Sequence, residues 1–176
     1  MKEIVFSETQ KFKTLWAWLA VLALNILFIY AIVQQMIFGV PFGTKPAPDF
    51  VLIIVEFFLL CLLIFLLSIK LKTRITGEGI FYRFYPFQLK ERQIAWHELS
   101  DAYMRDYNSF QEYGGWGLRT GSPKTGKAIN TSASSNRGLQ LRFGDGRLLL
   151  IGTKRPDEIQ IIIDKIIQAG KINRRV

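Results

Sequence analysis

The segment Gly121-Ser-Pro-Lys-Thr-Gly-Lys127 has the glycine and lysine spacing of a phosphate-binding P-loop. In a P-loop, backbone N–H groups and the lysine hold the phosphates, and a serine or threonine follows at the start of a helix. Here the next residue is Ala128, which has no hydroxyl group to ligate magnesium, and residues 129–132 are typical of a strand or loop. We therefore predict a basic hairpin loop in place of a nucleotide site.

Other side chains that could support catalysis or hold a metal are sparse. The chain has one cysteine, Cys61, and one histidine, His97, so it can form no internal disulfide and offers no Cys/His set of metal ligands. The C-terminal part shows no carboxylate pair and no nucleophile placed beside a base. We expect a protein that is not an enzyme and that uses no metal and no small-molecule cofactor.

Glu56 is the one charged residue inside a long apolar block. A charged group in lipid costs about 2.5 to 3.5 kcal/mol on insertion scales, so it needs a partner or a function. In an antiparallel hairpin whose facing residue numbers sum to about 88, Glu56 lies near Ile32 and within a turn of Gln34 and Gln35. We expect Glu56 to pair with a glutamine or to reach interfacial water, and a transport or proton-relay role is the alternative. Asn25 is expected to pair the two helices.

Two apolar blocks precede the soluble part of the chain, at residues 14–38 and 50–71. Each is long enough, at about 1.5 Å per residue, to cross a hydrocarbon core of roughly 30 Å. The link at residues 39–49 contains three prolines, which prevent one continuous helix. The sequence predicts a transmembrane helix hairpin in residues 1–71.

Basic residues lie before the first block and at the end of the second, while the link between the blocks contains only one, Lys45. Because basic residues stay on the cytoplasmic side, we expect a multi-pass protein of the cell inner membrane with both termini in the cytoplasm. The flanking residues are Lys2, Lys11, Lys13, Lys70, Lys72 and Arg74.

The net charge of +9 comes from the region after the hairpin, where residues 70–176 hold nineteen basic and ten acidic side chains. A basic surface favours anionic partners, and membrane lipid is the nearest one. Candidate lipid contacts are Lys70, Lys72, Arg74 and Arg83. Nucleic acid is not expected, because the aromatic residues alternate with apolar ones as core strands do.

After Lys70 the pattern changes to alternating apolar and polar residues with glycine turns, which is typical of consecutive strands. The clearest hairpin joins residues 139–143 to residues 147–151 through Gly144-Asp-Gly146. The expected strands, about seven in number, are residues 72–76, 80–85, 94–107, 116–120, 127–131, 139–143 and 147–151.

A helix is expected to begin at Pro156 and to end at Gly170. Its isoleucines recur at helical spacing, so one face should pack on the sheet. A basic tail, residues 171–176, follows. The isoleucines are Ile159, Ile162, Ile163, Ile166 and Ile167.

The order of these elements resembles bacterial pleckstrin-homology-like (PH-like) membrane proteins with two N-terminal transmembrane helices. The residues that carry the resemblance are Ile75-Thr-Gly-Glu-Gly-Ile80, Ile94-Ala-Trp-His-Glu-Leu99, Tyr113-Gly-Gly-Trp-Gly-Leu-Arg119 and Leu150-Ile-Gly-Thr-Lys-Arg-Pro156. The resemblance implies an α+β fold, with a seven-stranded antiparallel barrel or sandwich and a C-terminal helix in residues 72–170. It also implies a cytoplasmic, non-enzymatic role, and it supplies no ligand.

We therefore expect a membrane-anchored interaction module that contacts anionic lipid, a protein partner or both. In the protein-binding alternative, Trp116, Arg119 and the loops of residues 108–138 grip a partner or a second copy. The sequence favours the interpretation in which Trp116 fills the core, which is also where Trp96 is expected. A further alternative is an assembly subunit or small transporter component that uses Glu56.

Overall fold

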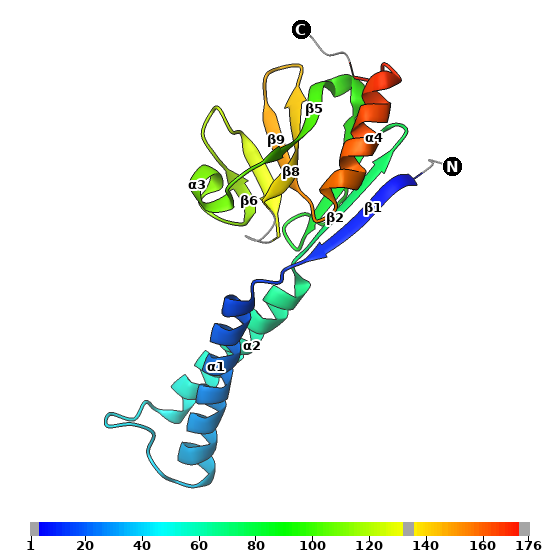
Figure 1. Ribbon diagram of the computed structural model, residues 1–176. Helices are drawn as coiled ribbons and strands as arrows, with labels where there is room; N and C mark the ends of the chain where they lie inside the picture. Colours follow the sequence, from blue (N-terminus) through cyan, green and yellow to red (C-terminus); the bar gives the residue numbers. More distant parts are fainter. Residues whose placement is uncertain (1–3, 132–135, 173–176) are drawn as a thin grey trace. The chain divides into compact units, whose positions relative to one another are not determined.

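The computed structural model describes residues 4–131 and 136–172 (Figure 1). The chain divides into two compact units, and one is inserted within the sequence of the other. The hairpin unit is Lys13–Ser68, and the sheet unit is Met1–Phe12 together with Ile69–Val176. After the hairpin unit, the chain thus returns to the unit in which it began.

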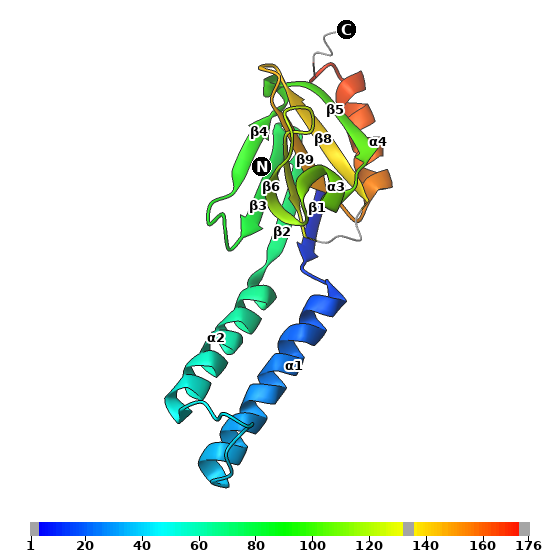
Figure 2. The same cartoon turned by 90° about the vertical axis from the view of Figure 1, so that its left-hand side faces the viewer.

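Two helices form the hairpin unit and lie side by side in both views (Figures 1 and 2). α1 covers Leu15–Ile32 and continues as a π-helical turn, Val33–Ile37, and α2 covers Asp49–Ser68. Both are long and apolar enough to cross a membrane, and only 22% and 17% of their apolar windows are buried inside the protein. These helices are therefore not the covered core helices of a globular domain.

The second predicted span, residues 50–71, is too long at its C-terminal end. α2 ends at Ser68, and Lys70 and Leu71 already belong to a strand. Leu71 is fully buried in the sheet unit. A continuous apolar run shows neither helical spacing nor strand alternation. The sequence therefore could not show where the helix ends and the strand begins, and the predicted boundary was misplaced.

A four-stranded antiparallel sheet opens the sheet unit, with strands in the order β1-β2-β3-β4 (Figure 2). Its strands are β1 (Ile4–Lys11), β2 (Lys70–Thr76), β3 (Gly79–Tyr85) and β4 (Arg92–Ala95). β1 was not predicted, because the sequence analysis grouped residues 1–13 with the hairpin. It pairs with β2 along its length, with Lys11 opposite Lys70.

The predicted strand at residues 94–107 is interrupted. A 3₁₀ turn, Trp96–Glu98, separates β4 from β5 (Leu99–Asp106), and the two strands belong to different sheets. The indole N–H of Trp96 donates a hydrogen bond to the carbonyl of Thr76 at 3.1 Å, and the side chain is 4% exposed. Trp96 is thus a core residue, as predicted, and it anchors the turn that carries the chain from one sheet to the other.

The second sheet has five strands in the order β5-β8-β9-β7-β6. They include β6 (Gly117–Thr120), β7 (Lys127–Asn130), β8 (Arg137–Phe143) and β9 (Leu148–Gly152), and a short helix α3 (Ser109–Tyr113) follows β5. The predicted hairpin around Gly144-Asp-Gly146 is confirmed as β8 and β9. β7 and β9 are parallel, which departs from the all-antiparallel expectation.

The fold is therefore α+β, with two long apolar helices, two sheets and a C-terminal helix. The described residues form nine strands in place of the expected seven, because β1 is added and the strand at residues 94–107 is divided. Neither sheet closes on itself, so the closure of the expected barrel is not confirmed.

Helix α4 (Pro156–Gln168) follows the prediction closely. Pro156 lies in its first turn together with Asp157 and Glu158. Carboxylates at this position stabilise the helix through their attraction to the positive end of its dipole. Its buried isoleucines, Ile159, Ile163 and Ile166, cover part of the core, and the helix contacts β5, β8 and β1. Of the expected basic tail, residues 173–176 lie outside the described residues, whereas Ile172 is buried and Lys171 donates to the carbonyl of Gly77 at 2.7 Å.

Candidate functional site

The basic residues of β2 point away from the core of the sheet unit. Strand residues alternate between two faces, and here one set is buried almost completely. The other set therefore forms the outward face, where Lys72 is exposed and its neighbours are half-buried. The buried set is Leu71, Thr73 and Ile75, and the outward set is Lys70, Lys72 and Arg74.

The strand register adds two more cations to this surface. Lys70 lies opposite Lys11 of β1, and Lys72 lies opposite Arg83 of β3. Directly opposed residues of an antiparallel pair share a face. We call Lys11, Lys70, Lys72 and Arg83 the basic face. Sequence analysis proposed three of these residues and missed Lys11, although residues 4–11 alternate as a strand does.

Arg74, the fourth predicted lipid contact, is already paired. It donates two hydrogen bonds to the carboxylate of Glu91, one of them from Nε at 3.0 Å. The residues of the basic face have no carboxylate partner among the residues that the structure describes. Instead, Lys70 and Arg83 lie 5.2 and 5.7 Å from the ring centre of Tyr85, which holds them without neutralising them.

The basic face lies beside both connections to the hairpin unit along the chain. Lys11 is the last residue of β1, and α1 begins at Leu15. Lys70 is the first residue of β2, and α2 ends at Ser68. The N–H of Phe12 also donates to the carbonyl of Ile69 at 3.2 Å, so the two connections leave from adjacent positions of the sheet.

Trp116 packs inside the sheet unit. It is half-buried, and its ring centre lies 4.6 Å from that of the buried Phe12. Arg119 is exposed, and its Nε donates to the carbonyl of Trp116 at 3.1 Å. The structure thus brings these two predicted partner-binding residues together, and the Trp116 ring packs on Phe12, the residue that directly follows β1.

A buried carboxylate fastens β1 to the far end of β9. Glu8 is 8% exposed and accepts hydrogen bonds from the hydroxyl of Thr153 at 2.7 Å and from the N–H of Lys154 at 3.0 Å. Gln10 donates to the carbonyl of Gly152 at 2.7 Å. These contacts join residues more than 140 positions apart, so no local pattern could have revealed them.

A second polar cluster holds α3 against β5. The guanidinium of Arg105 contacts the Glu112 carboxylate at 2.8 Å and the Tyr113 hydroxyl at 2.8 Å. Burial favours the neutral form of Glu112, but the hydrogen bonds from Arg105 and from the N–H of Asn108, with the charge of Arg105, outweigh it and lower the pKa of this carboxyl below its ordinary value. The cluster is structural, because every charged member is paired.

Residues 121–126 form the turn between β6 and β7, as predicted for a hairpin loop, and Lys127 is the first residue of β7. The N–H groups of Thr125 and Gly126 both donate to the carbonyl of Ser122, and the N–H of Gly121 donates to the carbonyl of Gly126. The chain continues as a strand where a P-loop needs a helix. This loop therefore cannot cradle phosphate with its backbone in the manner of a P-loop.

Glu56 is buried in the hairpin unit, but the expected hydrogen bond to a glutamine is not formed. Gln35 donates to Ala47 and Asp49 and accepts from the N–H of Phe42, so its amide fixes the link between the helices. Glu56 is 7% exposed, and neither carboxylate oxygen has a hydrogen-bond partner among the described residues.

The other polar candidates of the apolar blocks are placed differently. Asn25 is buried and donates to the carbonyl of Val21 within its own helix, and its side-chain oxygen has no partner among the described residues. Gln34 is half-buried. Glu56 and Asn25 thus leave unmet hydrogen-bonding capacity inside the apolar hairpin.

No curated protein and no solved structure matches this chain. A family model described as a family of unknown function, DUF6141, matches residues 2–169. The match runs through the hairpin unit and nearly all of the sheet unit, including β1. The chain therefore belongs to the DUF6141 family.

Proposed function

We propose that this protein is a two-span inner-membrane protein whose sheet unit contacts anionic lipid headgroups through the basic face. It acts as a membrane-anchored interaction module and not as an enzyme. The observation that carries the proposal is the row formed by Lys11 and Lys70, two cations without an ion-pair partner among the described residues, on paired strands that directly adjoin the two apolar helices in the chain.

Membrane insertion is supported by the small share of α1 and α2 that is buried inside the protein. Apolar helix surfaces of this length need a non-aqueous environment. The basic residues that precede α1 and follow α2 favour a cytoplasmic location for both termini and for the sheet unit.

Chain length limits how far the basic face can be from the bilayer. Lys70 is two residues beyond α2, and an extended chain covers at most about 3.6 Å per residue, so its Cα lies within roughly 7 Å of the end of that helix. Each basic residue near an anionic surface contributes about 1 kcal/mol of attraction. A row of such residues therefore favours lipid contact by several times the thermal energy.

The order of elements supports a PH-like identity for the sheet unit. Successive strands followed by a single C-terminal helix are what the resemblance implies, although β7 and β9 run parallel. β1 completes the first sheet from a position before the membrane hairpin. Folds host many functions, so this likeness supports a scaffold and leaves the ligand to the surface chemistry.

The lipid contact is tested with the full chain in nanodiscs, because a fragment that starts at residue 72 lacks β1 and the first residues of β2. A fluorophore sensitive to polarity is attached to Thr9→Cys in a Cys61→Ser background, since Thr9 lies opposite Lys72. We expect a blue shift in anionic nanodiscs relative to neutral ones. About 1 M salt should remove it, because the Debye length is then only about 3 Å.

Charge variants give the matched control. Replacing Lys70 and Lys72 by glutamine should abolish the shift, whereas replacing the exposed Lys154 and Lys165 changes the net charge equally and should preserve it. Equal emission in neutral and anionic nanodiscs would rule out the lipid contact.

Membrane topology is tested by labelling single cysteines in intact cells. Lys45→Cys in the link should react with a membrane-impermeant reagent added outside, and Asp145→Cys should be protected. The reverse pattern would contradict the cytoplasmic placement of the sheet unit.

A second candidate function is assembly or transport through Glu56, favoured by its buried and unpartnered carboxylate. In this case Glu56 receives a donor from another subunit or takes part in proton movement. We would compare Glu56→Gln and Glu56→Leu in liposomes, measuring energy transfer between copies labelled at the exposed Cys61 and the proton permeability. Unchanged transfer and unchanged permeability in both variants would eliminate this candidate.

A further inference from the structure

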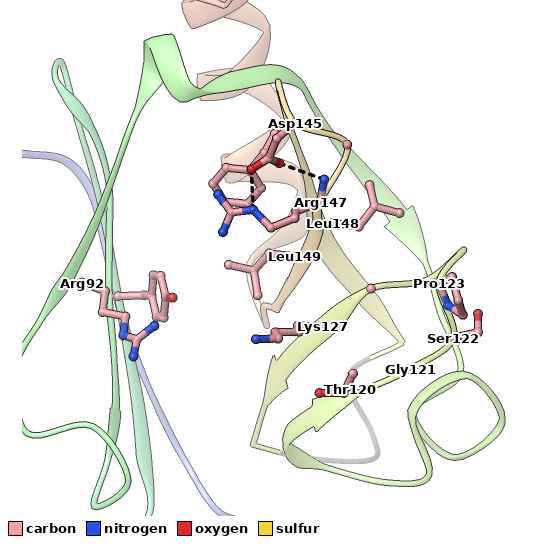
Figure 3. A pocket seen from close by; sticks show the side chains of 14 residues that line it. Arg92, Thr120, Gly121, Ser122, Pro123, Lys127, Asp145, Arg147, Leu148 and Leu149 are labelled. Atoms are coloured by element: carbon pink, nitrogen blue, oxygen red, sulfur yellow. Dashed lines mark hydrogen bonds and ion pairs between the residues drawn. The ribbon is translucent and has the colours of Figure 1, made fainter.

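A cavity of about 600 Å³ opens in the sheet unit, and no residue of the basic face lines it (Figure 3). Tyr82 and Arg92 line it from the four-stranded sheet, and Lys127, Phe143 and Leu149 line it from the five-stranded sheet. The turn between β6 and β7 forms another wall. Its volume is within the range of small-molecule sites.

Two cations in this cavity are uncompensated. Arg92 extends from β4 and Lys127 from β7, and their charged ends approach the space from opposite sides (Figure 3). Neither has an ion-pair partner among the described residues. Both are exposed, so a solute can reach them.

The one carboxylate among the described residues that line the cavity is already satisfied. Asp145 accepts a hydrogen bond from the N–H of Arg147 at 3.0 Å and another from its guanidinium at 2.6 Å. These bonds lower the pKa of the Asp145 carboxyl, so it stays ionised and paired with Arg147. The attraction for an anion therefore comes from Arg92 and Lys127.

Apolar groups form the rest of the surface. Tyr82 and Leu149 are almost buried, and the ring of Phe143 is covered on one side by Arg147 at 4.8 Å. Gly126 fixes the adjacent turn against β9, because a Cβ atom there would lie 2.4 Å from the carbonyl oxygen of Leu148. The wall is thus set by close backbone packing, and the N–H groups of Gly121, Thr125 and Gly126 already donate within the turn.

We infer that this cavity binds a small phosphate monoester with an apolar body, held at its head by Arg92 and Lys127 and along its body by Tyr82, Phe143 and Leu149. A phosphate monoester carries close to two negative charges at neutral pH, which matches two cations. The apolar wall distinguishes this ligand from inorganic phosphate. The inference is independent of the proposed lipid contact, because the two sites share no residue.

The test uses the full chain in neutral nanodiscs and titration calorimetry, with empty nanodiscs as blanks. Hexyl phosphate is the probe. Hexanol, which has the apolar chain without the phosphate, and inorganic phosphate, which has the charge without the chain, are the controls. We expect hexyl phosphate to bind at least about tenfold more tightly than either, since head and body contribute together.

Single variants identify the cavity. Arg92→Gln and Lys127→Gln should each weaken hexyl phosphate about tenfold, as expected for loss of one charge-assisted hydrogen bond. Asp145→Asn should strengthen it, because a negative charge is removed and Arg147 is released. Arg142→Gln and Lys165→Gln change exposed cations that do not line the cavity and should leave binding unchanged. Thermal midpoints of the variants should match that of the wild type.

Binding that is equal for hexyl phosphate and hexanol, or equal for hexyl phosphate and inorganic phosphate, would overturn the inference, as would insensitivity to both Arg92→Gln and Lys127→Gln. Competition then identifies the source of the ligand. Displacement by oleoyl lysophosphatidate placed in the nanodisc assigns a lipid, and displacement by soluble AMP assigns a water-soluble phosphate ester.

Discussion

The N–H of Phe12 donates a hydrogen bond to the carbonyl oxygen of Ile69, although 56 residues of the hairpin unit lie between them. The bond continues the antiparallel ladder of β1 and β2 past Lys11 and Lys70. In the sheet unit, the whole hairpin therefore occupies the place of a β-turn.

The sheet unit should fold without the hairpin if that turn is restored. Deleting residues 13–68 and joining Phe12 to Ile69 through Asn-Gly supplies a two-residue turn of the type that suits antiparallel strands. We expect a soluble protein with cooperative urea unfolding, followed by circular dichroism. Residues 69–176 alone, which lack β1, should show no cooperative transition. If both proteins fold equally well, β1 is dispensable.

Replacing Trp116 by alanine should destabilise this shortened protein by about 2 kcal/mol, because the half-buried indole loses its contact with Phe12. Trp116→Phe should cost less, since a ring is kept. Leu118→Ala, two residues further on and exposed, should change the free energy of unfolding by less than about 0.5 kcal/mol. Urea titration measures all three, and an effect of Trp116→Ala no larger than that of Leu118→Ala would show that the ring contact contributes nothing.

Glu8→Ala should lower the free energy of unfolding by about 2 to 3 kcal/mol, because Thr153 and Lys154 lose their acceptor in a buried site. Thr9→Ala, at the exposed neighbouring position, serves as the control and should have little effect. Amide hydrogen exchange should also show faster exchange at Lys154 in Glu8→Ala only. Unchanged protection there would mean that the carboxylate does not hold β9.

The contribution of Glu112 to stability should depend on pH. Its pKa is lower in the folded state than the ordinary value of 4.5, so its stabilisation is complete above that value and is lost as the pH falls below it. The difference in unfolding free energy between the wild type and Glu112→Gln should be roughly 1 kcal/mol at pH 7 and should shrink in acid. Arg105→Gln should remove the same pH dependence. A difference that stays constant from neutral to acid pH would disprove the ion pair.

Local patterns were enough to predict several elements. The isoleucine spacing and the proline and glycine at its ends specified α4, and Gly144-Asp-Gly146 between alternating runs specified the β8–β9 hairpin. The apolar blocks likewise predicted α1 and α2. In each case, the signal lies within about twenty consecutive residues.

Contacts between distant segments decided the rest. Residues 4–11 alternate as a strand does, but their hydrogen-bond partner is β2, about sixty residues later in the chain, and the run at residues 94–107 divides where Trp96 bonds to Thr76. The basic face and the cavity are also built from residues that are distant in the sequence.

The sequence by itself determined that the chain has an apolar hairpin and a basic, strand-rich remainder, because helix and strand periods and net charge are local or additive properties. Only the tertiary structure decided that Lys11 stands beside Lys70 and that Arg92 and Lys127 share a cavity. Those placements depend on strand register and on how two sheets face each other, and neither is encoded in the neighbours of any one residue.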